Sequence, residues 1–177
     1  PYSPQELIQF SNTDILSLER MMNSNPYLYE TRVYVDSTTM QEIMPILYRQ
    51  DRMNKQAWAS EEEKTGWKMD YTDRIFEDSA LYQDEKILSL VTSMRDYIYG
   101  EIGILEVSMK MDVMFPKLYE QTEGEWTFFV DSTGHSYGRT ESETQRTEYL
   151  PQVYEQVTGE DSPVISVKLD GQKMVAG

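Results

Sequence analysis

The stretch NPYLYETRVYVD, residues 25–36, predicts the point at which a helix gives way to a strand. Asn25-Pro26 ends any preceding helix, because the residue before a proline disfavours the helical region of the backbone. Beyond the proline, the side chains of residues 28–36 alternate in type, as they do along a strand whose successive side chains point to opposite faces. The sequence therefore predicts a helix that ends before Asn25 and a strand that follows it.

The two faces of this predicted strand differ in chemistry. The face expected to lie in the core carries Tyr29, Thr31, Val33 and Val35. The opposite face carries Leu28, Glu30, Arg32, Tyr34 and Asp36. A face that combines charged and aromatic side chains is typical of a strand that borders a ligand, so we expect Arg32, Tyr34 and Asp36 to face a binding site.

Residues 4–24 have the pattern of an amphipathic helix. Its mostly apolar stripe recurs at three- and four-residue spacing and consists of Leu7, Phe10, Asp14, Ile15, Leu18 and Met22. Pro4 stands where the first turn of a helix accepts proline. We expect this helix to pack against the core face of strand 28–36.

Residues 37–74 show mixed periodicity and form a long connection. Pro45 interrupts it, and DRMNKQAWASEEEK, residues 51–64, predicts a short helix that Gly66 ends. Long irregular connections inside a compact domain are uncommon and are more often functional than not.

Two segments complete the first module. DEKILSLVTSMRDY, residues 84–97, predicts a second helix with Asp84 as its cap. Its apolar stripe is Ile87, Leu88, Val91 and Met94. EIGILEVSMKM, residues 101–111, is the most strand-like run in the chain. One of its faces carries Gly103, Leu105, Val107, Met109 and Met111, and the other Ile102, Ile104, Glu106 and Ser108.

The remaining sequence predicts a connector and two hairpins. DVMFPKLYEQTEG is a helical connector with Pro116 in its first turn, and residues 148–157 predict a further helix. The predicted hairpins are residues 125–139 and residues 162–177, the second around the turn pair Asp170-Gly171. The sequence thus predicts an α+β protein with a complete module at 1–115 and an incomplete one at 116–177, and we expect the natural domain to continue past Gly177.

Composition narrows the class of function. The 177 residues include 16 basic and 31 acidic side chains, a net charge of -15 that repels nucleic acid and anionic lipid. The chain has no cysteine, which excludes disulfides, thiolate metal sites and thiol catalysis. It contains no apolar run long enough to cross a bilayer and no signal peptide. It begins with Pro1 rather than Met, so we expect it to be part of a longer protein.

Signatures of catalysis are missing from the sequence. His135 is the only histidine and lies in a predicted turn, without a nucleophile elbow elsewhere to support a Ser-His-Asp triad. No glycine-rich phosphate loop or calcium-binding EF-hand loop is present. Among 31 acidic residues nothing singles out a carboxylate pair for glycoside hydrolysis. The sequence therefore favours a binding or sensing module, without cofactor or metal, over an enzyme.

The order of several motifs resembles a known family. A leading helix stops at NSNPYLYETRVYVD, and the segments QAWASEEEKTGW, EKILSLVTSMRD, GEIGILEVSMKMDVMFPKLYE and EWTFFVDSTGHSYG follow in that order. This order resembles the extracellular double Cache domain, a tandem PAS-like sensor, of YesM-type bacterial sensor histidine kinases. The resemblance covers most of the chain and is best between residues 20 and 135.

The resemblance carries expectations about fold and function. It implies a PAS-like antiparallel sheet with a long N-terminal helix in a membrane-distal, ligand-binding module (1–115), followed by a partial membrane-proximal module (116–177). It further implies a homodimeric two-component receptor at the extracytoplasmic face of the bacterial membrane, anchored by segments outside this chain. The kinase domain is not in this sequence, so no enzymatic activity is expected of it. A sugar or oligosaccharide is the implied ligand.

Some members of the Cache family bind amino acids through a signature in which an arginine stands two residues before a tryptophan. Here Arg52 lies six residues before Trp58, although Tyr71 and Asp73 match the later aromatic and acidic positions. The spacing at the centre of the signature therefore differs, which disfavours an amino acid as ligand.

The residues themselves also indicate a site for a polar ligand. Aromatic faces that can stack on a sugar are supplied by Trp58, Trp67, Tyr34, Tyr48 and Tyr71. Charged partners for hydroxyl groups are supplied by Arg32, Arg49, Arg52, Asp36, Asp70 and Asp73. From these we predict that the ligand-binding residues are Arg32, Tyr34, Arg52, Trp58, Trp67, Tyr71 and Asp73.

Other interpretations of the same sequence remain open. Trp58 and Trp67 also suit a purely structural role, in which they pin the long connection to the sheet. The chain would then be a protein-interaction or structural module without a small ligand. The ectodomain of a chemoreceptor or cyclase and an extracytoplasmic enzyme are further alternatives.

Overall fold

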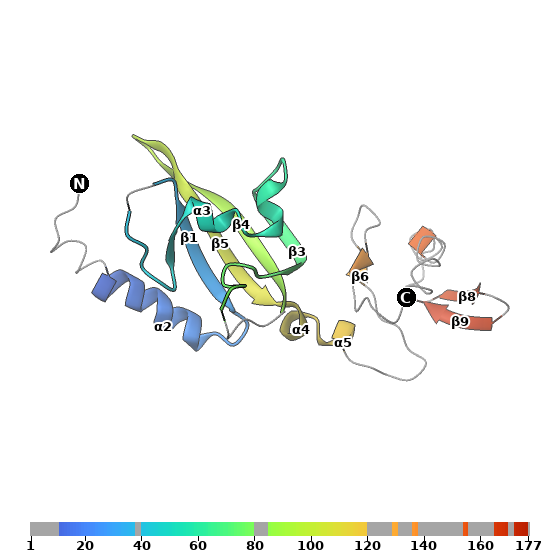
Figure 1. The fold of residues 1–177 in the computed structure, drawn as a ribbon. Coiled ribbons are helices and arrows are strands. Elements are labelled where there is room, and N and C mark those ends of the chain that lie inside the picture. Colours follow the sequence, from blue (N-terminus) through green and yellow to red (C-terminus); the bar gives the residue numbers. More distant parts are fainter. Residues whose placement is uncertain are drawn as a thin grey trace. The chain divides into compact units, whose positions relative to one another are not determined.

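The structure, a computed structural model, describes residues 11–37, 40–79, 85–119, 129–130, 136–137, 154–155, 165–169 and 172–176. The chain divides into two compact units, Pro1–Phe115 and Pro116–Gly177, which are treated separately (Figure 1). No helix among the described residues is both long and apolar enough to cross a membrane.

Helical structure covers the end of the predicted N-terminal helix. A five-residue π-helical turn, η1 (Ser11–Ile15), leads into the α-helix α2 (Leu16–Ser24). Asn25 is extended, and its backbone N–H donates to the carbonyl of Met22 at 3.0 Å. The predicted stop at Asn25-Pro26 is confirmed, whereas the predicted start at Pro4 lies outside the described residues.

A five-stranded open sheet follows, in the order β2-β1-β5-β4-β3. Its strands are β1 (Glu30–Val35), β2 (Leu47–Arg49), β3 (Gly66–Thr72), β4 (Lys86–Asp96) and β5 (Gly100–Lys110). The predicted α+β class and the strands at 28–36 and 101–111 are confirmed. The expected antiparallel sheet is found in part: β1, β5, β4 and β3 pair antiparallel, but β2 pairs in parallel with β1, so the sheet is mixed.

The helix predicted over residues 84–97 is wrong, because this segment is strand β4. It lies between β3 and β5 and buries side chains of both faces, with Ile87 and Ser89 on one face and Leu88 on the other. A strand covered on both faces carries a continuous apolar run, which also satisfies helical spacing. Pairing with the two neighbouring strands, β3 and β5, therefore makes this segment a strand and not a helix.

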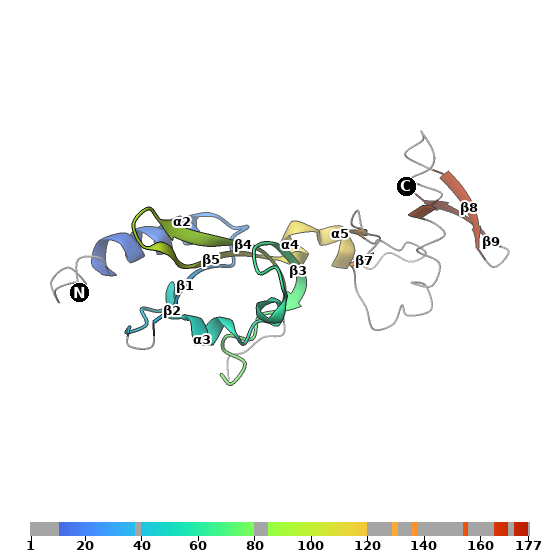
Figure 2. The same ribbon diagram turned by 90° about the horizontal axis from the view of Figure 1, so that it is seen from above.

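The two faces of the sheet support two separate apolar clusters. On one face, Val33 and Ile46 pack with Ile15, Leu18 and Met22 of the N-terminal helical segment. On the other face, the cluster contains Tyr34, Tyr48, Met53, Trp58, Tyr71, Ile75, Ile87, Val91 and Ile104. Figure 2 accordingly shows α2 and α3 (Gln50–Met53) on opposite sides of the sheet.

The alternation predicted for residues 28–36 holds within strand β1. Val33 faces α2 and Tyr34 faces the opposite cluster, as expected. Tyr29 departs from the prediction, because it lies one residue before the strand begins and packs against the cluster of Tyr34. Asp36 lies just after the strand and is exposed.

The long connection between β1 and β4 contains β2, α3, a 3-10 helix η2 (Ala57–Ser60) and β3. The single helix predicted over residues 51–64 is therefore replaced by two short ones, and Gly66 begins β3 instead of ending a helix. Gly66 has a φ of 106°, a conformation that favours glycine. The connection folds back over the sheet face of Tyr34 and buries Met53 and Trp58 there.

Beyond β5 the chain forms α4 (Met111–Met114) and α5 (Pro116–Tyr119), so the helical connector with Pro116 in its first turn is confirmed. In the second unit, β6 (Phe129–Val130) pairs with β7 (Ser136–Tyr137), and β8 (Ile165–Leu169) with β9 (Gln172–Ala176). Both predicted hairpins are thereby confirmed. Of the helix predicted over 148–157, Tyr154 and Glu155 are described and are helical.

Candidate functional site

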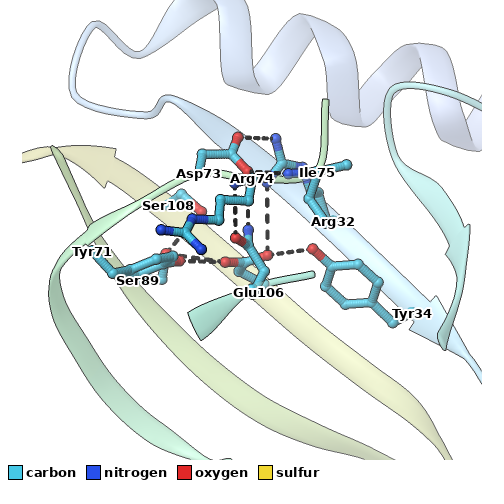
Figure 3. Close-up of polar contacts among 10 residues, drawn as sticks. Arg32, Tyr34, Tyr71, Asp73, Arg74, Ile75, Ser89, Glu106 and Ser108 are labelled. Carbon is cyan, nitrogen blue, oxygen red and sulfur yellow. Dashed lines mark hydrogen bonds and ion pairs between the residues drawn. The ribbon is translucent and has the colours of Figure 1, made fainter. Parts of the chain in front are cut away.

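A buried ion pair joins strand β1 to the end of β3. The Arg32 guanidinium donates from Nη1 to Asp73 Oδ1 at 3.0 Å and from Nη2 to Asp73 Oδ2 at 2.6 Å (Figure 3). The two side chains are only 1% and 8% exposed. This bidentate geometry is the strongest form of the arginine–carboxylate contact, and it fixes the guanidinium plane.

Glu106 on β5 is a second buried carboxylate, next to this pair. Its Oε2 accepts a hydrogen bond from the Tyr34 hydroxyl at 2.5 Å and lies 3.9 Å from Arg32 Nη1. Its Oε1 accepts from the Tyr71 hydroxyl, and Ser89 Oγ lies 3.4 Å from it. The Ser89 hydroxyl donates to Ser108 Oγ at 2.9 Å. Figure 3 shows these groups converging on the Glu106 carboxylate from several strands.

Gln56 ties the long connection to the same group of side chains. Its Nε2 donates to Asp73 Oδ1 at 3.0 Å, and its Oε1 accepts the backbone N–H of Arg74 at 3.2 Å. Asp73 Oδ1 also accepts the N–H of Ile75 at 3.2 Å. The buried polar cluster thus consists of Arg32, Tyr34, Gln56, Tyr71, Asp73, Ser89, Glu106 and Ser108.

Strand register brings the cluster together. Arg32 on β1 lies directly opposite Glu106 on β5, and Ser89 on β4 lies directly opposite Ser108 on β5. Residues that face each other across a strand pair share one face of the sheet. On β3 the register shifts between Lys68 and Tyr71, at Asp70 with its φ of 54°. This bulge lets Lys68 and Tyr71, three residues apart, both be buried.

The electrostatics of the cluster keep its tyrosines protonated and its arginine charged. Burial, together with the Glu106 carboxylate, raises the pKa of Tyr34 and of Tyr71 well above the ordinary value. Burial disfavours the Arg32 cation, but the hydrogen bond and charge of Asp73, with Glu106, raise the pKa of Arg32 overall. Burial also raises the pKa of Glu30, and Asp73 and Glu106 add to this shift against the opposing charge of Arg32.

Three buried polar atoms around this cluster make no well-aligned hydrogen bond: Arg32 Nε, the Tyr48 hydroxyl and Trp58 Nε1. Each has a polar neighbour, because Tyr48 lies within hydrogen-bonding reach of Arg32, and Trp58 of Tyr71. Burial raises the pKa of Tyr48 to about 12, while the charge of Arg32 opposes the shift, so the two groups are neighbours. The rings of Tyr48 and Trp58 lie 6.1 and 6.5 Å from the ring of Tyr34. These aromatic side chains therefore pack in one cluster and interact with the buried polar groups.

Five of the seven predicted site residues lie together, namely Arg32, Tyr34, Trp58, Tyr71 and Asp73. Arg52 and Trp67 do not join them. Arg52 pairs with Glu42, at 2.8 Å between Nε and Oε2, and its guanidinium lies over the rings of Tyr48 and Phe76. Its contact with Tyr48 places it at the edge of the site, outside the polar cluster.

Trp67 was expected to face the strand of Arg32, and this expectation is wrong. It is 59% exposed and lies opposite Leu90 on the sheet face away from the cluster, because side chains alternate along β3 and the neighbouring Lys68 is buried. Asp36 and Arg49 also lie elsewhere. They line a shallow polar cleft of about 340 Å³ together with Ser37, Gln50, Asp51 and Asn54.

Sequence analysis missed Gln56, Ser89, Glu106 and Ser108 as members of the site. A signal for three of them was present, because Ser89, Glu106 and Ser108 interrupt the two most apolar runs of the chain. Polar residues inside such runs are buried when the runs form central strands, and buried polar groups need partners. The incorrect helix assignment of residues 84–97 concealed the juxtaposition of Ser89 with Glu106.

Comparison with models of protein families, with curated proteins and with solved structures gives no match for this chain. Among the described residues, no group of three or more histidine or acidic side chains is placed to hold a metal ion.

Proposed function

We propose that unit Pro1–Phe115 is the ligand-sensing module of an extracytoplasmic receptor, and that its site is the buried polar cluster with Tyr48 and Trp58. The mixed five-stranded sheet of an α+β protein is consistent with the PAS-like fold that the sequence resemblance implies. In this proposal the module is a Cache domain of a two-component sensor histidine kinase. The parent protein is membrane-anchored and homodimeric, and signals across the membrane.

The observation that carries the proposal is the buried polar cluster itself, in which Arg32, Asp73 and Glu106 lie in the interior beside aromatic side chains. Replacing a buried ion pair with apolar side chains is often neutral or stabilising, so stability alone does not explain three buried ionisable groups in one place. Here Arg32, Asp73 and Glu106 are almost completely buried, in contact with the aromatic cluster that contains Tyr48 and Trp58. Pockets for small molecules combine such aromatic walls with a few placed polar groups.

In this proposal, signalling depends on the two elements that the site connects, β1 and the long connection. Arg32 and Tyr34 belong to β1, whose opposite face carries Val33 against the helical segment of Ile15 and Met22. A ligand that binds one arrangement of β1 and the long connection better than another shifts the population of the two arrangements. The packing of α2 on Val33 then changes with it, and we propose that this change is the output of the module.

A thermal-shift screen of sugars, polyols and amino acids against the chain tests this function. A rise in melting temperature with one class of compound, lost in Tyr71→Phe and in Trp58→Phe, supports it. Trp67→Phe is the matched control and should keep the response, because Trp67 lies on the other face of the sheet. If no compound stabilises the protein, the sensing function is rejected.

A second candidate is a protein-interaction module, and the turn between β4 and β5 favours it. Tyr97, Ile98 and Tyr99 are almost fully exposed at the tip of this hairpin. Asp96 Oδ1 accepts the N–H groups of Ile98 at 2.7 Å and Tyr99 at 3.0 Å, so the tip has a defined shape. A chain with all three tip residues changed to serine that keeps its response to a small ligand but loses a protein partner would assign the two functions to separate sites.

A further inference from the structure

The hairpin of β4 and β5 extends beyond the rest of the sheet. On one side, the pairing of β3 with β4 reaches only Gly66 opposite Val91. On the other side, the pairing of β1 with β5 reaches only Tyr34 opposite Ile104. Residues 92–103 therefore form a ribbon whose outer edges pair with no described strand, and Figure 1 shows it projecting past β1 and β3. A two-stranded ribbon alone is only marginally stable in water, so contact with a further chain would stabilise it.

The tip of this ribbon is apolar and largely exposed. Tyr97 is fully exposed, Ile98 and Tyr99 are 78% and 80% exposed, and Ile102 behind them is 41% exposed. The backbone N–H groups of Ile98 and Tyr99 are held by Asp96, so an ordered turn presents these side chains. Exposed aromatic and branched apolar side chains gathered in one place are typical of a contact surface between proteins.

The charge of the chain favours a second copy of itself as the partner at this tip. A twofold dimer brings the same patch of both copies together, so the patch has to be complementary to itself. With a net charge of -15, contact over much of the surface would bring carboxylates of the two copies together. The tip avoids this repulsion, because residues 97–99 are uncharged.

Opposite charges flank the tip on the two strands. Arg95 on β4 lies directly opposite Glu101 on β5, and both side chains are exposed. Neither forms an ion pair with another described residue. When two such ribbons meet about a twofold axis, Arg95 of one copy can face the partner's Glu101 on both sides of the axis. Charges at the edge of a contact contribute little affinity, but they determine which partners associate and in which orientation.

We propose that the tip is the contact surface between two copies of this chain. The copies meet about a twofold axis, with Tyr97, Ile98 and Tyr99 packed against the same residues of the partner and Arg95 facing the partner's Glu101. The inference rests on the proposed function, in which the parent protein is homodimeric, and assigns the contact between its copies. Because the contact is small, the chain in solution associates weakly. Anchoring of the parent protein in a membrane raises the effective concentration of the tips.

Sedimentation of the chain from about 10 μM to about 1 mM, a range that covers weak association, tests the contact. We expect a reversible monomer–dimer equilibrium that the triple variant Tyr97→Ser/Ile98→Ser/Tyr99→Ser abolishes. This variant should unfold at the same urea concentration as the unchanged chain, since the tip residues belong to neither apolar cluster. A chain that is monomeric over the whole range, or dimers that persist in the triple variant, would overturn the proposal.

Tyr27→Ser is the matched control for the triple variant. It removes another exposed aromatic side chain, which lies before the start of β1, where Glu30 pairs with Ser108 at the far end of β5 from the tip. The equilibrium should be unchanged in this variant. Equal loss of dimers in Tyr27→Ser would show that the association is not confined to the tip, and would overturn the proposal.

A second arm exchanges the flanking charges. Arg95→Glu and Glu101→Arg each bring like charges together across the twofold axis, so either variant alone should dimerise about tenfold more weakly. An equal mixture of the two variants restores both contacts between opposite charges and should recover the affinity of the unchanged chain. Pairing within one copy cannot be restored by mixing, so a mixture that associates no better than its components would overturn the proposed contact.

The outcome is independent of the ligand screen. A chain that does not dimerise through the tip but is stabilised by one class of compound refutes this inference and leaves the sensing function intact. A chain that dimerises through the tip but responds to no compound supports the contact, and only the sensing function is then rejected.

Discussion

Arg32 and Asp73 form a bidentate ion pair across 41 residues of sequence, with donor–acceptor distances of 3.0 and 2.6 Å in the interior of the first unit. Arg32 lies in β1 and Asp73 just beyond β3. In the sheet order β2-β1-β5-β4-β3, strands β5 and β4 lie between β1 and β3. The pair thus connects a strand of the sheet to the end of the long connection. Gln56 and Glu106 extend the link to η2 and to β5.

Removing one partner of this pair is expected to destabilise the fold strongly. Asp73→Ala leaves the Arg32 guanidinium buried without its main partner, for which a loss of about 3–5 kcal/mol is typical. The free energy of unfolding, measured by urea titration, checks this. The exposed pair Lys55–Asp78 provides the control, and Asp78→Ala should change stability by less than about 1 kcal/mol. The double variant Arg32→Met/Asp73→Leu should recover most of the loss, and equal losses in the single and double variants would contradict a role for the uncompensated charge.

Stability is expected to fall at alkaline pH because of the buried tyrosines. The pKa of Tyr48 is raised to about 12 from an ordinary 10.0, and the pKa values of Tyr34 and Tyr71 are raised further. Below pH 10 these tyrosines are protonated in both states and their contribution to stability is fully present. Above pH 10 the unfolded chain loses protons that the folded chain retains, so the free energy of unfolding decreases as pH rises.

Urea titrations between about pH 8 and 11 measure this slope, in the range where free tyrosine begins to ionise. Tyr34→Phe and Tyr71→Phe should make the slope shallower. Tyr97→Phe, at the exposed tip of the β4–β5 hairpin, should leave it unchanged. A slope that none of the buried-tyrosine variants alters would show that other groups cause the alkaline loss.

Replacing Gly103 by alanine is expected to disturb the contact between β5 and β1. A Cβ atom at this position would collide with the backbone carbonyl oxygen of Tyr34, and the backbone of a paired strand cannot move aside cheaply. A loss of about 1–3 kcal/mol is expected from this overpacking. Gly100 is the control: nothing lies near its Cβ position but its φ is 77°, so Gly100→Asn, which tolerates that region, should be nearly neutral. Equal tolerance of alanine at Gly103 would contradict the close approach of the two strands.

The two tryptophans are expected to differ sharply in their contribution to stability. Trp58→Ala removes a fully buried ring from the cluster of Tyr34 and Tyr48 and should cost about 3–5 kcal/mol. Trp67→Ala removes a largely exposed side chain whose cross-strand neighbour is Leu90, and should cost about 1 kcal/mol or less. Urea titration of both variants measures the contrast, and equal losses would show that Trp67 is covered in solution.

Where local chemistry dominates, the sequence was a reliable guide to the fold. Asn25-Pro26 ends the helix because of a steric restriction within two residues, and the two hairpins form where turn residues separate strand-forming runs. The alternation in residues 30–35 likewise predicted that Val33 and Tyr34 face different clusters, since neighbouring side chains of a strand point to opposite faces. Each of these features depends on residues that are adjacent in the sequence.

The candidate site was only partly predictable. Arg32, Tyr34, Trp58, Tyr71 and Asp73 were chosen for their residue types and do lie together. Trp67 was chosen for the same reason and faces away, because the bulge at Asp70 and the register of β3 with β4 determine which side chains share a face. Ligand binding at the site stays a prediction until the experiments above are done.

The sequence by itself determined an α+β chain, the end of its first helix, the two-faced strand β1 and the hairpins of the second unit, because turn chemistry and side-chain alternation act over a few residues. Only the tertiary structure decided that residues 86–96 form a strand, that β2 pairs in parallel with β1, and that Glu106 and Ser89 lie beside Arg32. Apolar residues at helical spacing satisfy both a helix and a strand covered on two faces, and the hydrogen bonds and burial that distinguish the two arise from neighbouring strands far away in the sequence.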